Sequence, residues 1–95
     1  METTNLDYFL QTTKDELTAY LNEINQQQLI DAAELIVAAK KKKGRVHVTG
    51  IGKPSHVAEY IAALLSSTGT PTYFLDGTET IHGSAGQAEK GDVVI

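Results

Sequence analysis

The chain has 95 residues, enough for at most one small domain, and its 41% hydrophobic and 21% charged residues are typical of a globular protein. Twelve acidic against eight basic side chains give a net charge of −4, which argues against a nucleic-acid-binding surface. The absence of cysteine excludes disulfides and thiolate metal sites. No apolar run approaches the ~20 residues that cross a bilayer, and the N-terminus lacks a signal-peptide pattern, so we expect a cytoplasmic protein that does not engage membranes.

Residues 1–43 are predicted to form an all-helical section. Apolar residues recur at the spacings of an amphipathic helix at Leu6, Phe9, Leu10, Leu17, Leu21 and Ile24. A break near residues 22–25 separates this helix from a second one, whose apolar face is formed by Leu29, Ala33, Ile36 and Val37. These faces are larger than a small sheet can cover, which predicts a homodimer or a higher assembly.

The second helix ends in four lysines, 40–43, followed by Gly44. Such a run invites a nucleic-acid or membrane interpretation. In an acidic chain, however, it makes a weak patch, and cations at a helix C-terminus complement the helix dipole. We therefore interpret the lysines as structural, and we expect Gly44 to be the left-handed residue that caps the helix.

After Gly44 the hydrophobic period changes. A β-branched run at 45–49 predicts a strand, followed by a glycine turn and a helix with Pro54 in its first turn. A second strand is predicted at 72–75, then a glycine-rich connection with one helical turn around 78–82, and a third strand at 92–95. These spacings predict parallel pairing. The fold class is therefore α/β: N-terminal helices, then the start of a doubly wound parallel sheet.

Residues 93–95, Val-Val-Ile, have the pattern of a buried parallel strand. Three parallel strands with so few helices would leave one sheet face and one edge in water. We therefore expect residues 44–95 to be the first, incomplete part of a longer domain.

The turn 50–56, Gly-Ile-Gly-Lys-Pro-Ser-His, is the first candidate binding site. Glycines between a strand and a helix allow backbone amides to approach a ligand closely, and a helix N-terminus favours an anion. Lys53 adds a positive charge and Ser55 a hydroxyl group. This combination predicts a site for a phosphate or an oxygen-rich ligand.

Three motif interpretations compete for this turn. A Walker A loop is excluded because His47 and Pro54 occupy two of its required positions. A dinucleotide fingerprint is matched by Gly50, Gly52 and an acidic residue, Asp76, after the second strand. A structural turn without a ligand is the third interpretation, and the turn by itself leaves these last two open.

The ordered motifs from residue 50 to residue 83 resemble the opening half of the sugar isomerase (SIS) domain family, particularly its arabinose-5-phosphate isomerase-like branch. A strand ends in Gly-x-Gly-Lys, and His56 follows the lysine by three residues. Ser-Thr-Gly-Thr-Pro at 67–71 then precedes an aromatic strand, and a Glu-x-x-His-Gly block occupies 79–83. The resemblance covers about residues 44–95 and implies a sheet of flavodoxin-like order.

This resemblance implies that Lys53 and His82 are catalytic, because a lysine and a histidine at the matching positions of the isomerases line the sugar-phosphate site. It implies substrate contacts from Gly50, Gly52, Ser55, His56 and Glu79. The reaction would be aldose–ketose interconversion, in which a base moves a proton between adjacent carbons while donors stabilise an enediolate. His82 is the candidate base or ring-opening group, and Lys53 the stabilising cation. The expected partner is a phosphorylated sugar, the assembly is a homodimer or tetramer, and no cofactor is expected.

Two positions depart from the branch. Lys53-Pro54-Ser55-His56 stands where the isomerases read Lys-Ser-Gly-His, and Ser84 stands where they have aspartate. Both departures lie in the expected pocket and leave the sugar unspecified. The resemblance also implies that the serine- and threonine-rich loop that grips the phosphate follows the third strand, so this chain alone is expected to be inactive.

Structural roles compete for several of these residues. His47 alternates with two valines on the first strand, and we interpret it as a packed or edge histidine. A structural hydrogen bond suits His56 as well as a ligand contact does, and Glu79 could simply cap its turn. Glu79 and His82 alone do not make a metal site, so none is expected.

Two other functions stay open. SIS domains also serve as sugar-phosphate sensors in transcription regulators, although residues 1–43 lack an evident basic recognition helix. The other alternative is a NAD-type dinucleotide domain. Lys53 and Ser55 argue against it, because the third fingerprint position is normally a glycine that allows close packing of helix and strand.

Overall fold

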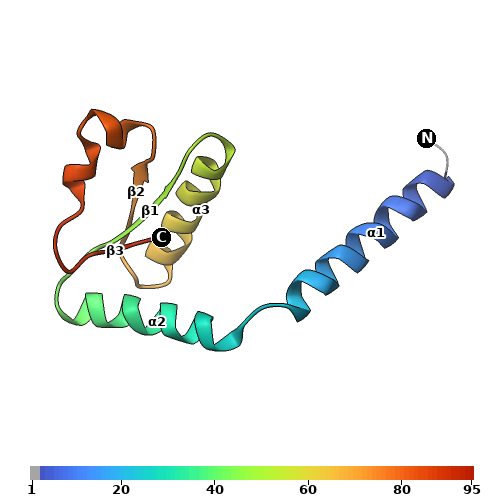
Figure 1. Ribbon diagram of the computed structural model, residues 1–95, viewed down its shortest axis with the longest axis horizontal. Coiled ribbons are helices and arrows are strands. Elements are labelled where there is room, and N and C mark those ends of the chain that lie inside the picture. Colours follow the sequence, from blue (N-terminus) through green and yellow to red (C-terminus); the bar gives the residue numbers. More distant parts are fainter. Residues whose placement is uncertain (1–2) are drawn as a thin grey trace. The chain divides into compact units, whose positions relative to one another are not determined.

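The computed structural model describes residues 3–95, which fall into two compact units, one up to Ile30 and the other Asp31–Ile95. The first contains a long helix and the start of a second, and the other contains a small parallel sheet with its connections (Figure 1). The elements in chain order are α1 (Thr3–Asn22), α2 (Gln26–Lys41), β1 (Val46–Gly50), α3 (Lys53–Ser67), β2 (Thr72–Asp76), η1 (Glu79–His82), η2 (Ser84–Gln87) and β3 (Val93–Val94). The boundary predicted after residue 43, between the N-terminal helical section and the first part of the sheet domain, stays a prediction.

The predicted N-terminal helix is confirmed, but α1 buries none of its residues. Its apolar stripe is exposed, with Phe9 at 62%, Leu17 at 56% and Leu21 at 55%. The predicted break is confirmed as well, because α1 ends at Asn22 and α2 begins at Gln26. Asn25 caps α2: its side-chain oxygen accepts the amide hydrogen of Gln28 over 3.1 Å, which satisfies one of the unpaired N–H groups at the helix start.

The C-terminus of α2 differs from the prediction. Lys43, not Gly44, adopts the left-handed conformation, with a φ of 60°. The amides of Gly44 and Lys43 donate to the carbonyls of Ala39 and Lys40 over 2.8 Å and 3.1 Å, as in a Schellman motif. A glycine is still needed at 44, because a Cβ there would lie 2.5 Å from the carbonyl oxygen of Gly91. The glycine at 44 is therefore required by packing against a segment distant in sequence, and not by the left-handed cap that the local pattern predicted.

The three strands form one parallel sheet in the order β2-β1-β3. The central strand β1 pairs with β2 from Val46↔Thr72 to Gly50↔Asp76. It pairs with β3 on its other side, beginning at Val46↔Val93. The predicted parallel α/β fold is therefore confirmed, and the order agrees with the start of a flavodoxin-like sheet. Each predicted strand agrees with an observed one to within two residues at either end.

The core lies between one face of the sheet and α3. Val48 of β1 packs with Ala58 and Ala62 of α3, and Ile61 and Phe74 border this cluster. The two alanines lie one helical turn apart, so α3 presents a row of small side chains to the strand. Both are almost completely buried, as is Val48. The predicted position of Pro54 in the first turn of this helix is confirmed.

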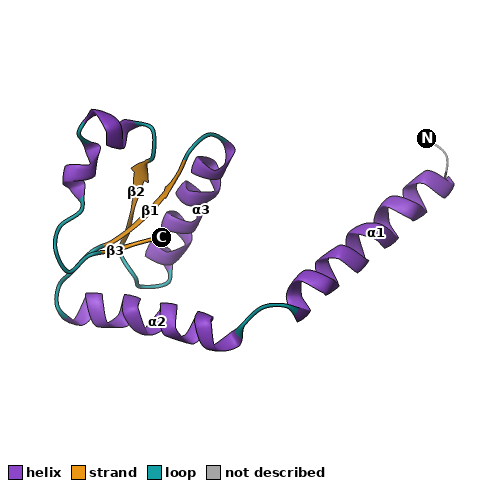
Figure 2. Ribbon diagram, in the orientation of Figure 1, coloured by secondary structure: helices purple, strands orange, loops and turns teal. Residues whose placement is uncertain are grey.

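The connection 77–92 covers the opposite face of the sheet (Figure 2). Because successive side chains of a strand point to opposite faces, and Val48 faces α3, His47 faces this connection. The helical turn expected around residues 78–82 is confirmed as η1 (Glu79–His82), while η2 (Ser84–Gln87) was not expected. The connection carries His82, and its attachment to the sheet therefore determines where that side chain stands.

Candidate phosphate-binding turn and its surroundings

The turn between β1 and α3 requires its two glycines for different reasons. At Gly50, a Cβ would lie 2.8 Å from the carbonyl carbon and oxygen of Pro54, so only glycine allows the helix to start this close to the strand. Gly52 is the N-cap of α3 and has φ 69° and ψ −134°, a conformation that L-residues with side chains avoid. Open space surrounds the position of its missing side chain. A ligand can therefore approach the backbone at Gly52.

Lys53 is the first residue of α3, where the unpaired amides of the helix start give a partial positive charge. Its side chain is exposed and makes no hydrogen bond or ion pair within the described residues. Ser55 is partly occupied: its hydroxyl and its amide both donate to the carbonyl of Gly52, the amide over 3.0 Å. His56 is exposed on the same first turn. The cation at this turn is thus free, while the serine hydroxyl already has a partner.

A cavity of about 430 Å³ lies beside this turn, and its walls are mainly apolar side chains of β1 and α3. Its lining residues are Val48, Thr49, Lys53, Pro54, Val57, Ala58, Ile61 and Ile95. The hydroxyl oxygen of Thr49 is buried without a hydrogen-bond partner within residues 3–95. A buried polar atom without a partner is costly, so it marks a point where a ligand or water group fits. The sequence reading missed Thr49, since a threonine in a β-branched run looks like a strand former.

The turn after β2 lies at the same end of the sheet. One carboxylate oxygen of Asp76 accepts the amides of Thr78 and Glu79 over 2.8 Å and 3.1 Å, which fixes the start of η1. Gly77 donates its amide to the carbonyl of Gly50 over 3.2 Å and so joins this turn to the one before α3. The carboxyl ends of parallel strands are where ligands bind in open α/β sheets.

The structure brings the candidate residues together only in part. Lys53 follows β1 and His82 follows β2, and these strands are paired at their last residues by Gly50↔Asp76. His82 and Glu79 are both exposed, and neither lines the cavity beside Lys53. Gly83, which follows His82, has a φ of 113° and ends η1. The two proposed catalytic side chains therefore share one end of the sheet but no common cavity among the described residues.

The face of the sheet opposite α3 holds a buried polar network. His47 is completely buried, and its Nε2 lies 2.8 Å from Oδ2 of Asp92. Its Nδ1 lies 3.0 Å from the side-chain nitrogen Nε2 of Gln87, which also donates to the carbonyl of Phe74 over 3.2 Å. The tautomer with its proton on Nε2 satisfies all three contacts. The interpretation of His47 as a packed histidine agrees with this burial.

Asp92 anchors this network as a carboxylate. Hydrogen bonds from the amide of Arg45, then from the amide of Glu89, and then from His47 lower the pKa of Asp92 from 3.8 to about 2. Both backbone donors lie 2.8 Å from carboxylate oxygens. The sequence reading took Asp92 only as the start of the third strand. An acid just before one strand and a histidine inside its neighbour were the signals that could have revealed it.

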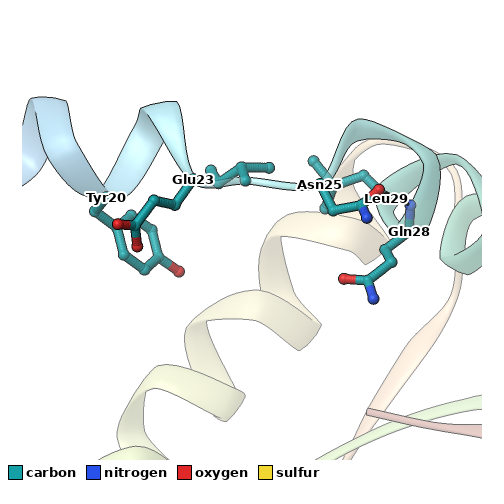
Figure 3. A pocket seen from close by; sticks show the side chains of 6 residues that line it. Tyr20, Glu23, Asn25, Gln28 and Leu29 are labelled. Atoms are coloured by element: carbon teal, nitrogen blue, oxygen red, sulfur yellow. Dashed lines mark hydrogen bonds between the residues drawn. The ribbon is translucent and has the colours of Figure 1, made fainter.

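A second cavity of about 420 Å³ lies at the bend between α1 and α2 (Figure 3). It is lined by Tyr20, Glu23, Ile24, Asn25, Gln28 and Leu29, none of which is a predicted site residue. Within residues 3–95 no three histidine or acidic side chains are grouped to hold a metal ion. No helix among those residues combines the length and apolarity needed to span a membrane.

The chain is similar to known sugar-phosphate isomerases. No family model matches it. It is 43% identical over 82 residues to the arabinose 5-phosphate isomerase KdsD of Pseudomonas aeruginosa, covering 86% of this chain and 24% of that protein. It is 39% identical over 77 residues to the arabinose 5-phosphate isomerase GutQ of an Escherichia coli strain, covering 81% of this chain and 23% of that protein. The chain thus spans about a quarter of the length of these curated relatives.

Two solved structures show the same fold. One is a Bacteroides fragilis protein assigned to phosphosugar isomerisation in capsule formation, with a TM-score of 0.80 and 32% identity over 94% of this chain and 47% of that one. The other is an E. coli protein in complex with a phosphosugar, with a TM-score of 0.77 and 31% identity over 99% of this chain and 50% of that one. The resemblance recognised from the motifs is confirmed: the chain corresponds to the N-terminal part of a sugar isomerase (SIS) domain of the arabinose-5-phosphate isomerase-like branch.

Proposed function

We propose that this chain supplies the first part of the site of an aldose–ketose isomerase that acts on a phosphorylated sugar. The observation that carries the proposal is the turn at Gly52 and Lys53, at the end of a parallel strand. It combines an open backbone, a helix N-terminus and an ammonium group that has no partner among residues 3–95. This combination suits a sugar phosphate, and the relatives that are arabinose 5-phosphate isomerases support a pentose phosphate as the first ligand to test.

The residues suggest roles in the reaction. Moving a proton between adjacent carbons requires a general base, and the developing enediolate requires a positive charge. His82 is proposed as that base or as the group that opens the sugar ring, and Lys53 as the cation. Glu79, Ser55, His56 and the two turn glycines are proposed substrate contacts. The hydroxyl of Thr49, which has no partner in the described part of the chain, joins them as a candidate donor to a sugar oxygen.

We expect the 95 residues alone to be inactive. The relatives are about four times longer, and His82 and Lys53 line no common cavity within the described residues. The remaining walls of a site must therefore come from elsewhere, either from further residues or from another copy of the chain. The exposed apolar stripe of α1 supports a homodimer or tetramer, because helices of soluble proteins normally cover such faces. We propose a cytoplasmic location, in keeping with the sugar-phosphate ligand.

The experiment uses the full-length gene product that contains these residues. Thermal shift against pentose phosphates, hexose phosphates and NAD ranks the ligands, because a ligand that binds the native state raises its stability. Isomerisation of arabinose 5-phosphate to its 2-ketose isomer is then followed directly. We expect a shift with a pentose phosphate and turnover of the same compound. A shift with NAD alone would contradict the proposal.

A sugar-phosphate sensor is the second candidate. Pro54 removes an amide donor from the turn, and Ser84 replaces a carboxylate that the isomerases usually carry, so binding without turnover is a coherent outcome. A thermal shift without isomerisation of any pentose or hexose phosphate would favour it. The NAD-type alternative is disfavoured by Lys53 and by Ser55, which stands at the third fingerprint position where a glycine normally allows close packing of helix and strand.

A further inference from the structure

The connection that carries His82 is attached to the sheet at few points. At its start, Asp76 accepts two amides of the connection and Gly77 donates to Gly50. At its end, Asp92 accepts the amide of Glu89. Between Gly77 and Asp92, the one described side chain that hydrogen-bonds a strand is that of Gln87. It therefore provides the middle attachment of the connection.

The attachment at Gln87 depends on His47. The side-chain amide of Gln87 donates through its Nε2 to Nδ1 of His47 and to the carbonyl of Phe74, and both acceptors belong to strands. His47 has 0% exposure, so no solvent can replace a lost partner at its Nδ1. Asp92 holds the other ring nitrogen and so fixes the orientation of the ring. His47, Gln87 and Asp92, the His47 network, thus form one chain of contacts from the sheet to the connection.

Gln87 follows His82 by five residues, and Gly83 lies between them with a φ of 113°. η1 and η2 are joined by short local contacts, including the amide of Gly86 to the carbonyl of Gly83 over 3.0 Å. Release of Gln87 would leave the stretch from η1 to residue 88 with hydrogen bonds to the described strands and their turns only at its two ends. The position of His82 would then vary, and reactions of this kind lose rate steeply when a reacting group is misplaced.

We propose that His47 and Gln87 are positioning residues of the site: their buried contact holds the connection against the sheet and thereby places His82. The inference rests on the proposed function for its catalytic consequence, but not for its structural one. Neither residue touches the substrate in this assignment.

The test is a double-variant cycle in the full-length protein, with Gln87→Met, His47→Val and both together. Gln87→Met keeps the volume of the side chain and removes its donors. Each single variant leaves a buried polar group without its partner, so kcat for arabinose 5-phosphate should fall about tenfold or more with little change in KM. The double variant lacks the same contact, so its kcat should fall no further than in the more impaired single variant.

Ser66→Ala is the matched control. The hydroxyl of Ser66, in the last turn of α3, exchanges two hydrogen bonds with the backbone of Thr72 at the start of β2, at 3.1 Å and 3.0 Å. This variant should lose stability like Gln87→Met while keeping its kcat. Equal losses of kcat in the control and in Gln87→Met would overturn the proposal, and so would losses that add in the double variant.

Amide hydrogen exchange separates this inference from the proposed function. In Gln87→Met and His47→Val, amides of residues 77–91 should exchange about tenfold faster than in the wild type, while those of α3 stay unchanged. This result supports the placement of the connection even if the wild type isomerises no sugar phosphate, in which case the proposed function fails alone. Unchanged exchange in an active enzyme overturns the positioning role alone.

Discussion

His47 in the central strand and Asp92 before β3 lie 2.8 Å apart, nitrogen to oxygen, with side-chain exposures of 0% and 5%. A buried charge needs partners on every side, and Asp92 has two backbone amides besides the imidazole. The same carboxylate therefore ties the start of β1, the end of the connection and the face of the sheet together.

Asp92 should control the acid stability of the fold. Its pKa is lowered on folding from 3.8 to about 2, so its stabilising contribution is complete above pH 3.8 and is lost as the pH falls from there toward 2. Asp92→Asn should be less stable at neutral pH and should show a flatter loss of stability over that range. Urea unfolding at a series of pH values measures both. An unchanged slope in the variant would contradict this assignment.

Gly52→Ala should destabilise the protein by about 1–3 kcal/mol, because the backbone conformation at this position is one that only glycine adopts without strain. Gly86→Ala is the matched control, since open space surrounds its missing Cβ and its φ lies outside the strained range. It should change stability by less than about 0.5 kcal/mol. Chemical denaturation of both variants checks the difference, and equal effects would argue against strain at Gly52.

Lys43→Gly should stabilise the protein by about 1 kcal/mol. Lys43 has a φ of 60° and ends α2 in a conformation that glycine adopts without a steric cost. Lys41→Gly, in the last turn of the same helix, should instead destabilise by about 1 kcal/mol because glycine weakens helices. Melting temperatures of the two variants should therefore move in opposite directions, and a shared direction would refute the cap assignment.

Thr49→Val should raise stability while weakening ligand binding. The valine has nearly the same shape, and it removes a buried hydroxyl that has no partner within the described residues, which is worth about 1 kcal/mol or more. If that hydroxyl meets a sugar oxygen, affinity for a sugar phosphate falls in the same variant. Denaturation and calorimetric titration measure the two effects. A loss of stability would show that Thr49 has a structural partner.

Lys53→Met should weaken binding of sugar phosphates by about tenfold to a hundredfold, the range expected for a hydrogen bond to a charged group. Methionine keeps an apolar stem against the cavity wall, so the fold should be unaffected. Lys90→Met, an exposed lysine in the connection, is the charge-matched control. The same loss at both positions would indicate a general charge effect instead of a contact at the turn.

The fold was largely predictable from the sequence because its signals are local. Periodicity marked α1 and α3, the β-branched runs marked the strands, and Pro54 marked a helix start. The left-handed residue at the end of α2 is Lys43 and not the predicted Gly44. The glycine is required at 44 by the close approach of Gly91, a tertiary contact that the local sequence does not reveal. Motifs likewise identified the family, whereas the unpaired hydroxyl of Thr49 and the contact between Gln87 and His47 required the three-dimensional structure. The contact joins residues 40 positions apart, and the unpaired state of the Thr49 hydroxyl within the described residues is seen only once its surroundings are known.

A polar side chain in the middle of the central strand also has a consequence for folding. Parallel strands of β-branched residues can pair in more than one register, and a shift by one residue exchanges the two faces of a strand. In β1 such a shift would turn the imidazole of His47 toward Ala58 and Ala62, where no hydrogen-bond partner is available in the cluster. The mispaired sheet would bury an unsatisfied polar ring and lose the contact with Asp92. His47 thereby discriminates the native alignment of the strands from its nearest competitors before any ligand is bound.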